Sequence, residues 1–230
     1  KWGKKVLLSG KHLLMEKTFT STHSESEELF RIADQNSLKC MEALMYEFHP
    51  IQDKIDILSK EIGGIKHINA SFGFPYFSDK KDIRYNKNIG GGSILDSLIY
   101  PLSFTWRILG NNIKDYSKHF IETNVVERGT ICLRYDDAIA NINFGYGQAY
   151  QNEITIIGYD KIIKAERVFS RPPDNKNPIH IIQNNELTSI QVESSDHFEN
   201  MIRYFIQTDS LLEKQANTLL RLKFMDEIRK

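Results

Sequence analysis

Hydrophobic residues recur along the chain either at the spacing of a helix or in short runs and alternations typical of strands. The first part of the chain has the pattern of an α/β unit. Residues 11–16 read KHLLME, a short run with an apolar middle that predicts a strand. Residues 22–36 predict a helix, because apolar residues recur there at helical intervals and Ser24 and Glu27 have the spacing of a capping box. A second apolar run at residues 40–45 predicts another strand. Strand, helix and strand with short connections favour two parallel strands side by side.

The second part of the chain has the period-two pattern of strands that are covered on one face. Residues 67–74 alternate apolar and polar side chains over their whole length. Residues 131–135 and 138–146 alternate as well and predict a hairpin with a turn between them. Residues 153–157 and 161–165 predict a second hairpin. Together these strands indicate an antiparallel sheet.

The two patterns divide the chain near residue 48. Helical spacing returns at residues 198–205 and 212–220, and these two helices are expected to lie on the sheet. Residues 1–48 are predicted to be part of a larger parallel α/β domain, because two strands alone do not make a stable sheet. Residues 49–230 are predicted to form an α+β domain. The predicted fold class is therefore α+β: an open, mainly antiparallel sheet with helices on one face, preceded by a partial parallel α/β piece.

Composition removes several classes of function. The 230 residues are 40% hydrophobic, which is enough for a packed core, and 30 basic against 30 acidic residues give no excess of positive charge. Nucleic-acid binding is therefore not predicted. No apolar run approaches the roughly 20 residues of a membrane span, so no membrane association is predicted. Two cysteines, Cys40 and Cys132, favour a reducing cytoplasm over a disulfide framework, and the histidines lack the spacing of metal ligands.

Two segments contain residues that could carry chemistry. Glu16 and Lys17 follow the first predicted strand, where α/β sheets place their ligand crevice, although position alone favours a solvated charge. Downstream, a glycine-rich turn precedes an apolar segment with Asp96 and Tyr100 four positions apart. In a helix this spacing places both side chains on one face, and Pro101 predicts a kink beside them. A core tyrosine with a capped carboxylate fits the same pattern.

Several motifs in order resemble the glucose-fructose oxidoreductase / inositol dehydrogenase / MocA superfamily. They are GKHLLMEKTFT at 10–20, EALMYEFHP at 42–50, EIGGIKHINASF at 61–72 and DIRYNKNIGGGSILDSLIYPL at 82–102. The resemblance extends through ITIIGYDKIIKAERVF to the final helices, and so covers the whole chain. It implies a two-domain oxidoreductase. An N-terminal Rossmann domain would hold NAD or NADP, and a C-terminal sheet domain would close the substrate site and form the oligomer interface.

The resemblance also implies roles for individual residues. Lys17 corresponds to the catalytic lysine of the family, and Glu16 to its acid beside the cofactor. Asp96 corresponds to the aspartate that orients the substrate, and Tyr100 to the residue that exchanges the hydroxyl proton, where many members have histidine. Arg84 and His49 lie in matching motif regions and are predicted to bind substrate; the family chemistry needs no metal.

Three departures from the family pattern modify these expectations. The dinucleotide fingerprint G-x-G-x-x-G is absent, and the pair Gly145 and Gly147 lies in a strand pattern without a third glycine. The chain is expected to begin in the helix before the fifth Rossmann strand, so that residues 1–48 are a remnant of that domain with weak or no dinucleotide binding. Thr18 replaces the usual proline after Lys17, so that a trans bond and a displaced lysine are an alternative. Glu47 stands where relatives often carry a basic residue, and we interpret it as a surface charge.

The sequence therefore predicts a cytoplasmic oxidoreductase that uses NAD or NADP. Its substrate is expected to be a small carbohydrate, namely a sugar, a sugar nucleotide or a polyol, whose hydroxyl exchanges a hydride with the cofactor. A homo-oligomer through the C-terminal sheet is expected. Two alternatives remain: a truncated, non-catalytic binding or assembly module, and an NAD-dependent hydrolase or lyase of the same superfamily that borrows and returns the hydride.

Overall fold

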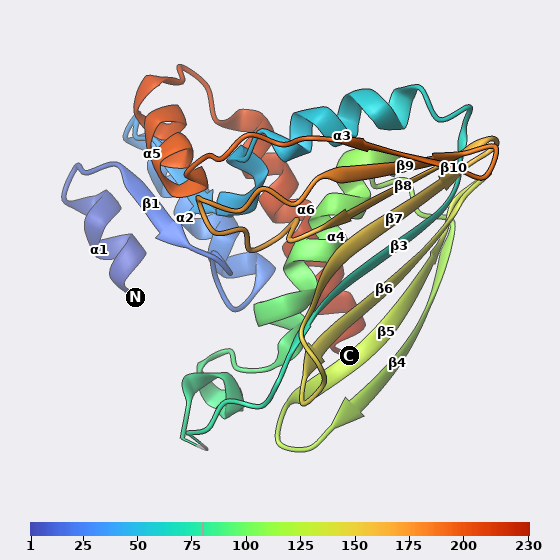
Figure 1. Ribbon diagram of the computed structural model, residues 1–230. Coiled ribbons are helices and arrows are strands. Elements are labelled where there is room, and N and C mark those ends of the chain that lie inside the picture. The colour runs from blue at the N-terminus through green and yellow to red at the C-terminus, as the bar shows by residue number, and fades with distance from the viewer. Residues whose placement is uncertain (80) are drawn as a thin grey trace. The chain divides into compact units, whose positions relative to one another are not determined.

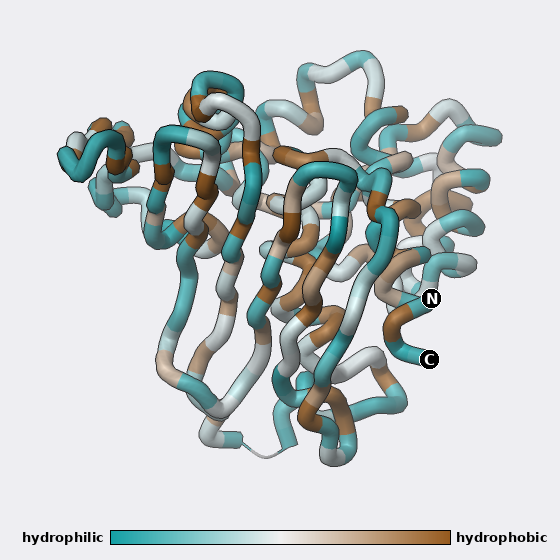
Figure 2. The backbone as a smooth tube through the Cα atoms, turned by 90° about the vertical axis from the view of Figure 1, so that its right-hand side faces the viewer, coloured by the Kyte–Doolittle hydropathy of each residue, from teal (hydrophilic) through white to brown (hydrophobic). Residues whose placement is uncertain are grey.

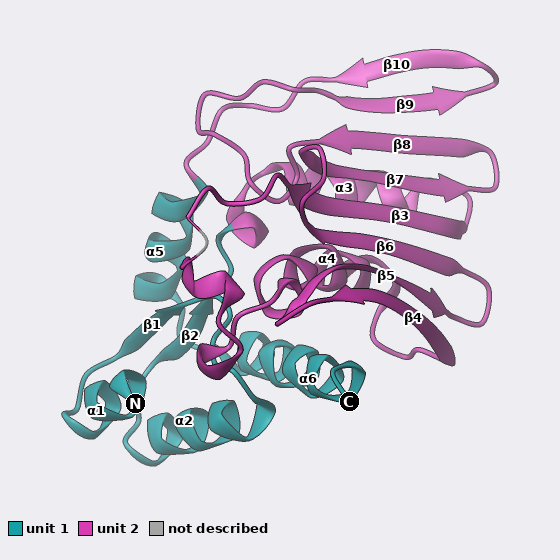
Figure 3. Ribbon diagram, turned by 90° about the horizontal axis from the view of Figure 1, so that it is seen from below, with its two compact units in different colours: residues 1–45, 197–230 teal, residues 46–196 magenta. Residues whose placement is uncertain are grey.

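The computed structural model describes residues 1–79 and 81–230, and the chain divides into two compact units. Unit 1 contains Lys1–Met45 together with His197–Lys230, and unit 2 contains Tyr46–Asp196 (Figure 3). Among the described residues, no helix combines the length and the apolar character that crossing a bilayer requires. The part of the chain covered by the structure also holds no group of three or more acidic, histidine or cysteine side chains suited to a metal ion.

Unit 1 contains the parallel strand pair that the sequence predicts. The two strands run in parallel from the pair Leu13 and Cys40 to the pair Glu16 and Ala43. The elements of the unit are α1 (Trp2–Leu8), β1 (Leu13–Glu16), α2 (His23–Gln35), β2 (Cys40–Ala43), α5 (His197–Gln207) and α6 (Leu212–Ile228). The strand, helix and strand order is thus confirmed (Figure 1).

The capping box of α2 lies two residues before the predicted one. The Thr22 hydroxyl accepts a hydrogen bond from the backbone N–H of Glu25, and the Glu25 carboxylate accepts one from the backbone N–H of Ser21. The bond to Thr22 satisfies an N–H group that the first turn of the helix leaves without a partner, and the bond from Ser21 fixes the residue before the cap. The predicted pair Ser24 and Glu27 has the same spacing but lies inside the helix.

The two C-terminal helices belong to unit 1, whereas the sequence pattern grouped them with the antiparallel sheet. Polar contacts explain why α6 packs on β2. The side-chain amide of Gln215 donates to the carbonyl of Cys40 at 3.3 Å, and the Arg221 guanidinium donates to the Glu42 carboxylate at 2.7 Å. Glu42 and Arg221 are both buried, so leaving either charge unpaired would cost free energy, and the packing of α6 on β2 brings the two charges together. The apolar spacing of a helix contains no information about such a distant polar partner.

Unit 2 is built on one sheet of eight strands. Their order across the sheet is β10-β9-β8-β7-β3-β6-β5-β4, in which β3 and β6 pair in parallel and every other neighbouring pair is antiparallel. The bounds are β3 (Ile65–Phe74), β4 (Asp115–Glu122), β5 (Val126–Arg134), β6 (Ile139–Tyr146), β7 (Gln151–Gly158), β8 (Lys161–Glu166), β9 (Ile179–Gln183) and β10 (Glu186–Ile190). Both predicted hairpins are confirmed, as β5-β6 and β7-β8. The parallel pairing of β3 with β6 and the three strands β4, β9 and β10 were not predicted.

The two faces of this sheet differ in polarity. On the face toward α4 (Ile99–Leu109), the side chains of Ile68, Ala70, Ile142 and Phe144 are almost completely buried. Polar side chains line the central strands on the opposite face, where the Asn141 amide donates to Asn69 at 3.2 Å. Figure 2 shows the resulting alternation of hydrophobic and hydrophilic positions along the strands. Unit 2 also contains helix α3 (Ile51–Lys60) and short 3₁₀ turns at Ile83–Tyr85 and Lys87–Ile89, and a third 3₁₀ turn, Met45–Phe48, begins at the last residue of the first segment of unit 1.

Candidate active site

The segment that carries Asp96 begins with a glycine turn and continues as a widened helical turn. Gly92 has a φ of +112°, which a residue with a side chain rarely adopts, and its N–H donates to the carbonyl of Arg84 at 2.8 Å. Residues Ile94–Leu98 then form a π-helical turn that runs directly into α4. The sequence predicted a kinked α-helix here. The irregularity lies just before Pro101, which has no N–H for the preceding turn, and single π turns of this kind are frequent at functional sites.

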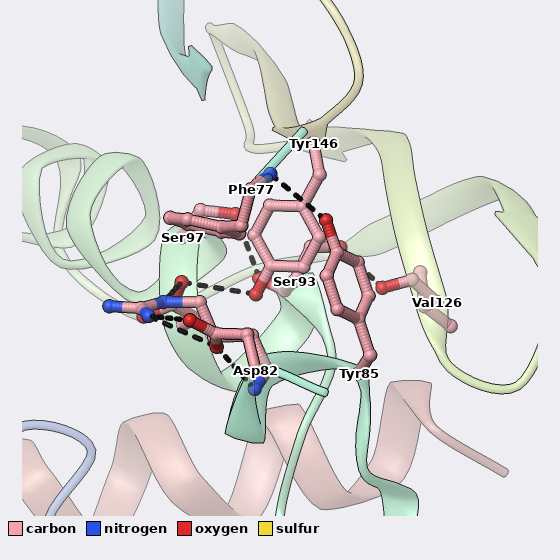
Figure 4. A network of polar contacts seen from close by, with 9 residues as sticks. Phe77, Asp82, Tyr85, Ser93, Ser97, Val126 and Tyr146 are labelled. Atoms are coloured by element: carbon pink, nitrogen blue, oxygen red, sulfur yellow. Dashed lines mark hydrogen bonds and ion pairs between the residues drawn. The ribbon is translucent and has the colours of Figure 1, made fainter. Parts of the chain in front are cut away.

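Asp96 is held by two hydrogen-bond donors that come from different elements. The Arg84 Nε atom and the Tyr146 hydroxyl both donate to its Oδ2 atom, each at 3.0 Å. Arg84 also donates through Nη1 to both carboxylate oxygens of Asp82, at 3.2 and 3.1 Å. The guanidinium lies 4.4 Å from the centre of the Phe77 ring. Figure 4 shows this network around the hydroxyl of Tyr146.

The charges in this network fix the donors and acceptors. Burial alone would lower the pKa of Arg84, but the charges of Asp96 and Asp82 raise it above its ordinary value. Burial, followed by the charge of Asp96, raises the pKa of Tyr146 far above its ordinary value, so this phenol stays protonated and donates. A hydrogen bond from the backbone N–H of Arg84 lowers the pKa of Asp82. Asp96 therefore accepts from a permanent cation and from a neutral phenol.

Tyr100 lies in the first turn of α4, within a buried aromatic cluster. Its side chain is 5% exposed, and its ring centre lies 4.8 Å from that of Phe72 and 5.8 Å from that of Tyr46. Tyr46 is tied to the same helix, because its hydroxyl shares a 2.7 Å hydrogen bond with the Ser103 hydroxyl, which donates to the carbonyl of Tyr100. The surrounding rings restrict the orientation of the Tyr100 side chain.

His49 is buried at the start of α3. It is 2% exposed, and its Nδ1 atom accepts a hydrogen bond from the backbone N–H of Ile51 at 3.1 Å. This bond gives the histidine a local structural role at the beginning of the helix. Substrate binding by His49 stays a prediction.

Lys17 and Glu16 lie in unit 1, at the carboxyl end of β1. Glu16 is exposed and Lys17 is half-buried, and the peptide bond between Lys17 and Thr18 is cis rather than trans. The backbone N–H of Phe19 donates to Oε1 of Glu42 at 2.9 Å. The segment after Lys17 is therefore fixed by a buried carboxylate.

Glu42 is itself held by helix α6. Its Oε2 atom accepts from the Thr218 hydroxyl at 3.1 Å and from the Arg221 guanidinium at 2.7 Å. The side chains of Glu42 and Arg221 are 2% and 7% exposed, so this ion pair is screened very little by water. A buried network of unit 1 thus connects the C-terminal helix to the segment that carries Lys17.

The structure brings together some of the predicted site residues. Arg84 and Asp96 are in direct contact, and Tyr100 follows Asp96 in the same continuous helical segment of unit 2. Lys17 belongs to unit 1, and its approach to Tyr100 stays a prediction.

The sequence reasoning missed several residues of these networks, among them Tyr146, Asp82, Glu42 and Arg221. Tyr146 had a detectable signal, because it ends an alternating strand on the apolar face, but its partner Asp96 is 50 positions away. Asp82 and Glu42 lie inside motifs that resemble the family, yet nothing in the pattern indicates that they accept hydrogen bonds from Arg84 and Arg221.

The residues of unit 1 fit one end of a dinucleotide. The carboxyl ends of β1 and β2 meet at the same edge of the parallel pair, which is where α/β sheets bind cofactors, and Glu16 and Lys17 follow β1 at this edge. Two parallel strands provide only a small part of a dinucleotide site. Glu16 and Lys17 therefore provide an acceptor and a cation at this edge for part of a dinucleotide, while the described residues contain no G-x-G-x-x-G turn for the pyrophosphate.

A family model and several relatives match this chain. Residues 54–164 match the GFO/IDH/MocA C-terminal domain. The dTDP-3,4-didehydro-2,6-dideoxy-alpha-D-glucose 3-reductase of Actinomadura kijaniata is 31% identical over 90% of this chain and 64% of the relative. The enzyme of the same name from Streptomyces antibioticus is 29% identical over 89% of this chain and 64% of the relative. The scyllo-inositol 2-dehydrogenase (NADP⁺) of Bacillus subtilis is 27% identical over 96% of this chain and 70% of the relative.

Solved structures agree with these matches. A 3-ketoreductase from Actinomadura kijaniata, crystallised with NADP and TDP-benzene, superposes with a TM-score of 0.93 at 27% identity, over 99% of this chain and 73% of that one. An aldose-aldose oxidoreductase from Caulobacter crescentus shares the fold at 16% identity, with a TM-score of 0.87. The chain spans 64% of the length of the two curated 3-reductases.

Proposed function

This chain belongs to the glucose-fructose oxidoreductase / inositol dehydrogenase / MocA superfamily, and from that membership we propose that it is part of an NADP-dependent oxidoreductase acting on a sugar. One observation carries the proposal. The motif aspartate, Asp96, is held by two donors at 3.0 Å, in the helical segment that goes on to present Tyr100. An ordered carboxylate four positions before a buried tyrosine, in one continuous helical segment, is suited to orienting a hydroxyl group whose proton the tyrosine exchanges.

The proposed substrate is a nucleotide-linked ketosugar. Four relatives from different bacteria, at 27–31% identity, are 3-reductases of a dTDP-linked didehydro sugar. The matching 3-ketoreductase structure contains TDP-benzene. These similarities favour a sugar nucleotide over a free sugar or a polyol, although the relatives also include a D-xylose 1-dehydrogenase and an inositol dehydrogenase.

Tyr100, Lys17 and Asp96 have complementary tasks in the proposed reaction. NADPH, when bound beside Glu16 and Lys17, would supply the hydride. Tyr100 would donate its phenolic proton to the carbonyl oxygen as that oxygen gains negative charge. The Lys17 ammonium group would stabilise the same developing charge, and Asp96 would accept a hydrogen bond from a neighbouring sugar hydroxyl. In the oxidative direction the hydride would pass from the sugar carbon to NADP⁺ and the hydroxyl proton to Tyr100.

The polar face of the sheet is the proposed contact between copies of the chain. On β3, β5 and β6 several of its side chains are half-buried and hydrogen-bonded in pairs, as in the 2.8 Å bond from Thr130 to Asn143 and the 3.2 Å bond from Asn141 to Asn69. A polar face whose side chains already hydrogen-bond to one another can be covered by a second copy with few polar groups left unpaired. The two unbonded cysteines agree with the proposed cytoplasmic location.

The protein in its complete natural form tests this proposal. We expect it to oxidise NADPH in the presence of a dTDP-linked 3-ketosugar, as measured by loss of the nicotinamide absorbance, and to convert an equal amount of sugar. Parallel assays with NADH and with a free ketosugar report on the choice of cofactor and on the need for the nucleotide. If neither nicotinamide is consumed with a nucleotide-linked or a free ketosugar, the proposal is wrong.

A further inference from the structure

We propose that Tyr146 is a positioning residue that, together with Arg84, holds the Asp96 carboxylate in one orientation for the substrate. The inference rests on the proposed function, because it assumes that Asp96 orients a sugar hydroxyl. It adds to the site a tyrosine that lies 50 positions from Asp96 in the sequence.

The first argument is the geometry at Asp96. Tyr146 approaches its Oδ2 atom from the end of strand β6, whereas Arg84 approaches from the 3₁₀ turn Ile83–Tyr85. Two donors from different elements define the direction of the carboxylate, because rotating it would break at least one of the bonds. The Asp96 side chain is still 19% exposed, so the restrained carboxylate remains accessible to a ligand.

The second argument is that Tyr146 is itself fixed. Its side chain is fully buried, and its ring centre lies 5.2 Å from that of Phe74 and 5.6 Å from that of Phe77. The hydroxyl at the end of a ring packed in this way can move little. Its position therefore determines where the carboxylate of Asp96 rests.

The glycines on both sides of Tyr146 fit the same purpose. Gly145 has a φ of +134°, and a Cβ atom there would lie 2.3 Å from the Cα atom of Arg128. Gly147 has a φ of +72°, and a Cβ atom there would lie 2.4 Å from the ring of Tyr76. Side chains at these positions would push the end of β6 away from its neighbours. The Gly145-Tyr146-Gly147 sequence thus serves close packing around the tyrosine, not dinucleotide binding.

The third argument is that Arg84, which the sequence predicted as a substrate ligand, uses its donors on two carboxylates of the protein. Its Nε atom donates to Asp96, and its Nη1 atom donates to both oxygens of Asp82. An arginine used in this way by two carboxylates acts as a rigid connection between them. Arg84 is therefore better suited to orienting Asp96 than to binding an anionic part of the substrate.

A double-mutant cycle with Tyr146→Phe and Asp96→Ala tests the proposal in the complete protein. For each variant, urea denaturation gives the unfolding equilibrium constant, and reduction of a dTDP-linked ketosugar by NADPH gives kcat and KM. In the wild-type background, Tyr146→Phe should raise the unfolding constant about tenfold and lower kcat/KM about tenfold, because one hydrogen bond to a charged acceptor is lost. In the Asp96→Ala background, the same change should have neither effect, since the acceptor is already gone.

Tyr135→Phe is the matched control. The Tyr135 hydroxyl is also buried, and it donates to the carbonyl of Gly110 at 3.1 Å. Its removal should raise the unfolding constant but change kcat/KM less than about twofold, because Gly110 is not part of the proposed site. A comparable loss of kcat/KM in this control would contradict a specific role for Tyr146.

The two readouts separate the possible failures. Equal effects of Tyr146→Phe on unfolding in both backgrounds would show that Tyr146 does not hold Asp96, and would overturn the proposal. The proposal is also overturned if Tyr146→Phe changes the unfolding constant only in the wild-type background but lowers kcat/KM by the same factor in both backgrounds. Tyr146 would then be a purely structural residue. A wild-type protein that reduces no ketosugar would instead contradict the proposed function, and the unfolding cycle would still decide whether Tyr146 holds Asp96.

Discussion

Replacing Tyr100 by phenylalanine should lower kcat of the complete protein by about 10²-fold or more, the usual scale for a general acid or base. The change removes only the hydroxyl that would exchange the proton and keeps the ring in its aromatic cluster. The fold and the affinity for NADPH should therefore change little. Steady-state kinetics gives kcat, titration with NADPH gives the cofactor affinity, and thermal unfolding monitors the fold.

Tyr46→Phe is the control for this prediction. The Tyr46 ring belongs to the same cluster, and its hydroxyl is hydrogen-bonded to Ser103 at 2.7 Å, so the control also removes one buried hydroxyl from the same aromatic environment. We expect this variant to keep most of the activity. If Tyr100→Phe turns over as fast as the wild type, Tyr100 does not exchange the proton.

Replacing Arg221 by methionine should lower the free energy of unfolding by about 3–5 kcal/mol, because it leaves the buried carboxylate of Glu42 without its cation. The Glu42 side chain is 2% exposed, and its carboxylate also accepts the N–H of Phe19 in the segment after Lys17. Loss of the Arg221 cation should therefore destabilise unit 1, including the segment after the proposed catalytic lysine, Lys17. Urea denaturation followed by circular dichroism measures the change.

Arg203→Met is the matched control for the ion pair. Arg203 also bonds a glutamate, Glu199, at 2.6 Å, but both side chains are more than half exposed. Water screens this pair, so its loss should cost at most about 0.5 kcal/mol. Equal destabilisation by Arg221→Met and Arg203→Met would contradict the importance of the buried pair.

The sequence predicted those strands and hairpins that are marked by the pattern of neighbouring residues. Alternation over β3, β5 and β6 marks strands with one buried face, and the short turns between β5 and β6 and between β7 and β8 specify their hairpins. Strand β10 was missed because four of its five residues are exposed, which leaves no alternation to detect. The parallel pairing of β3 with β6 was missed because it joins segments that are distant in sequence, and no local turn specifies it.

The candidate site was predictable to a similar extent. Asp96, Tyr100 and Lys17 lie in ordered motifs that resemble the superfamily, so their positions could be proposed from the sequence. The residues that hold them could not, because their contacts span long distances in sequence: 50 positions from Asp96 to Tyr146 and 179 from Glu42 to Arg221. A buried polar residue shows that it needs a partner, but its identity depends on the tertiary packing.

Direct transfer of deuterium tests the central claim, that this protein moves a hydride between NADPH and a sugar carbon. The complete protein would be mixed with a dTDP-linked ketosugar and NADPH that carries deuterium at the transferred position of the nicotinamide, and the sugar product would be analysed by mass spectrometry. We predict one deuterium on the reduced carbon for each NADPH oxidised, and almost none with Tyr100→Phe over the same time. A sugar that is cleaved or rearranged while NADPH is conserved, or a product without deuterium, would contradict the account.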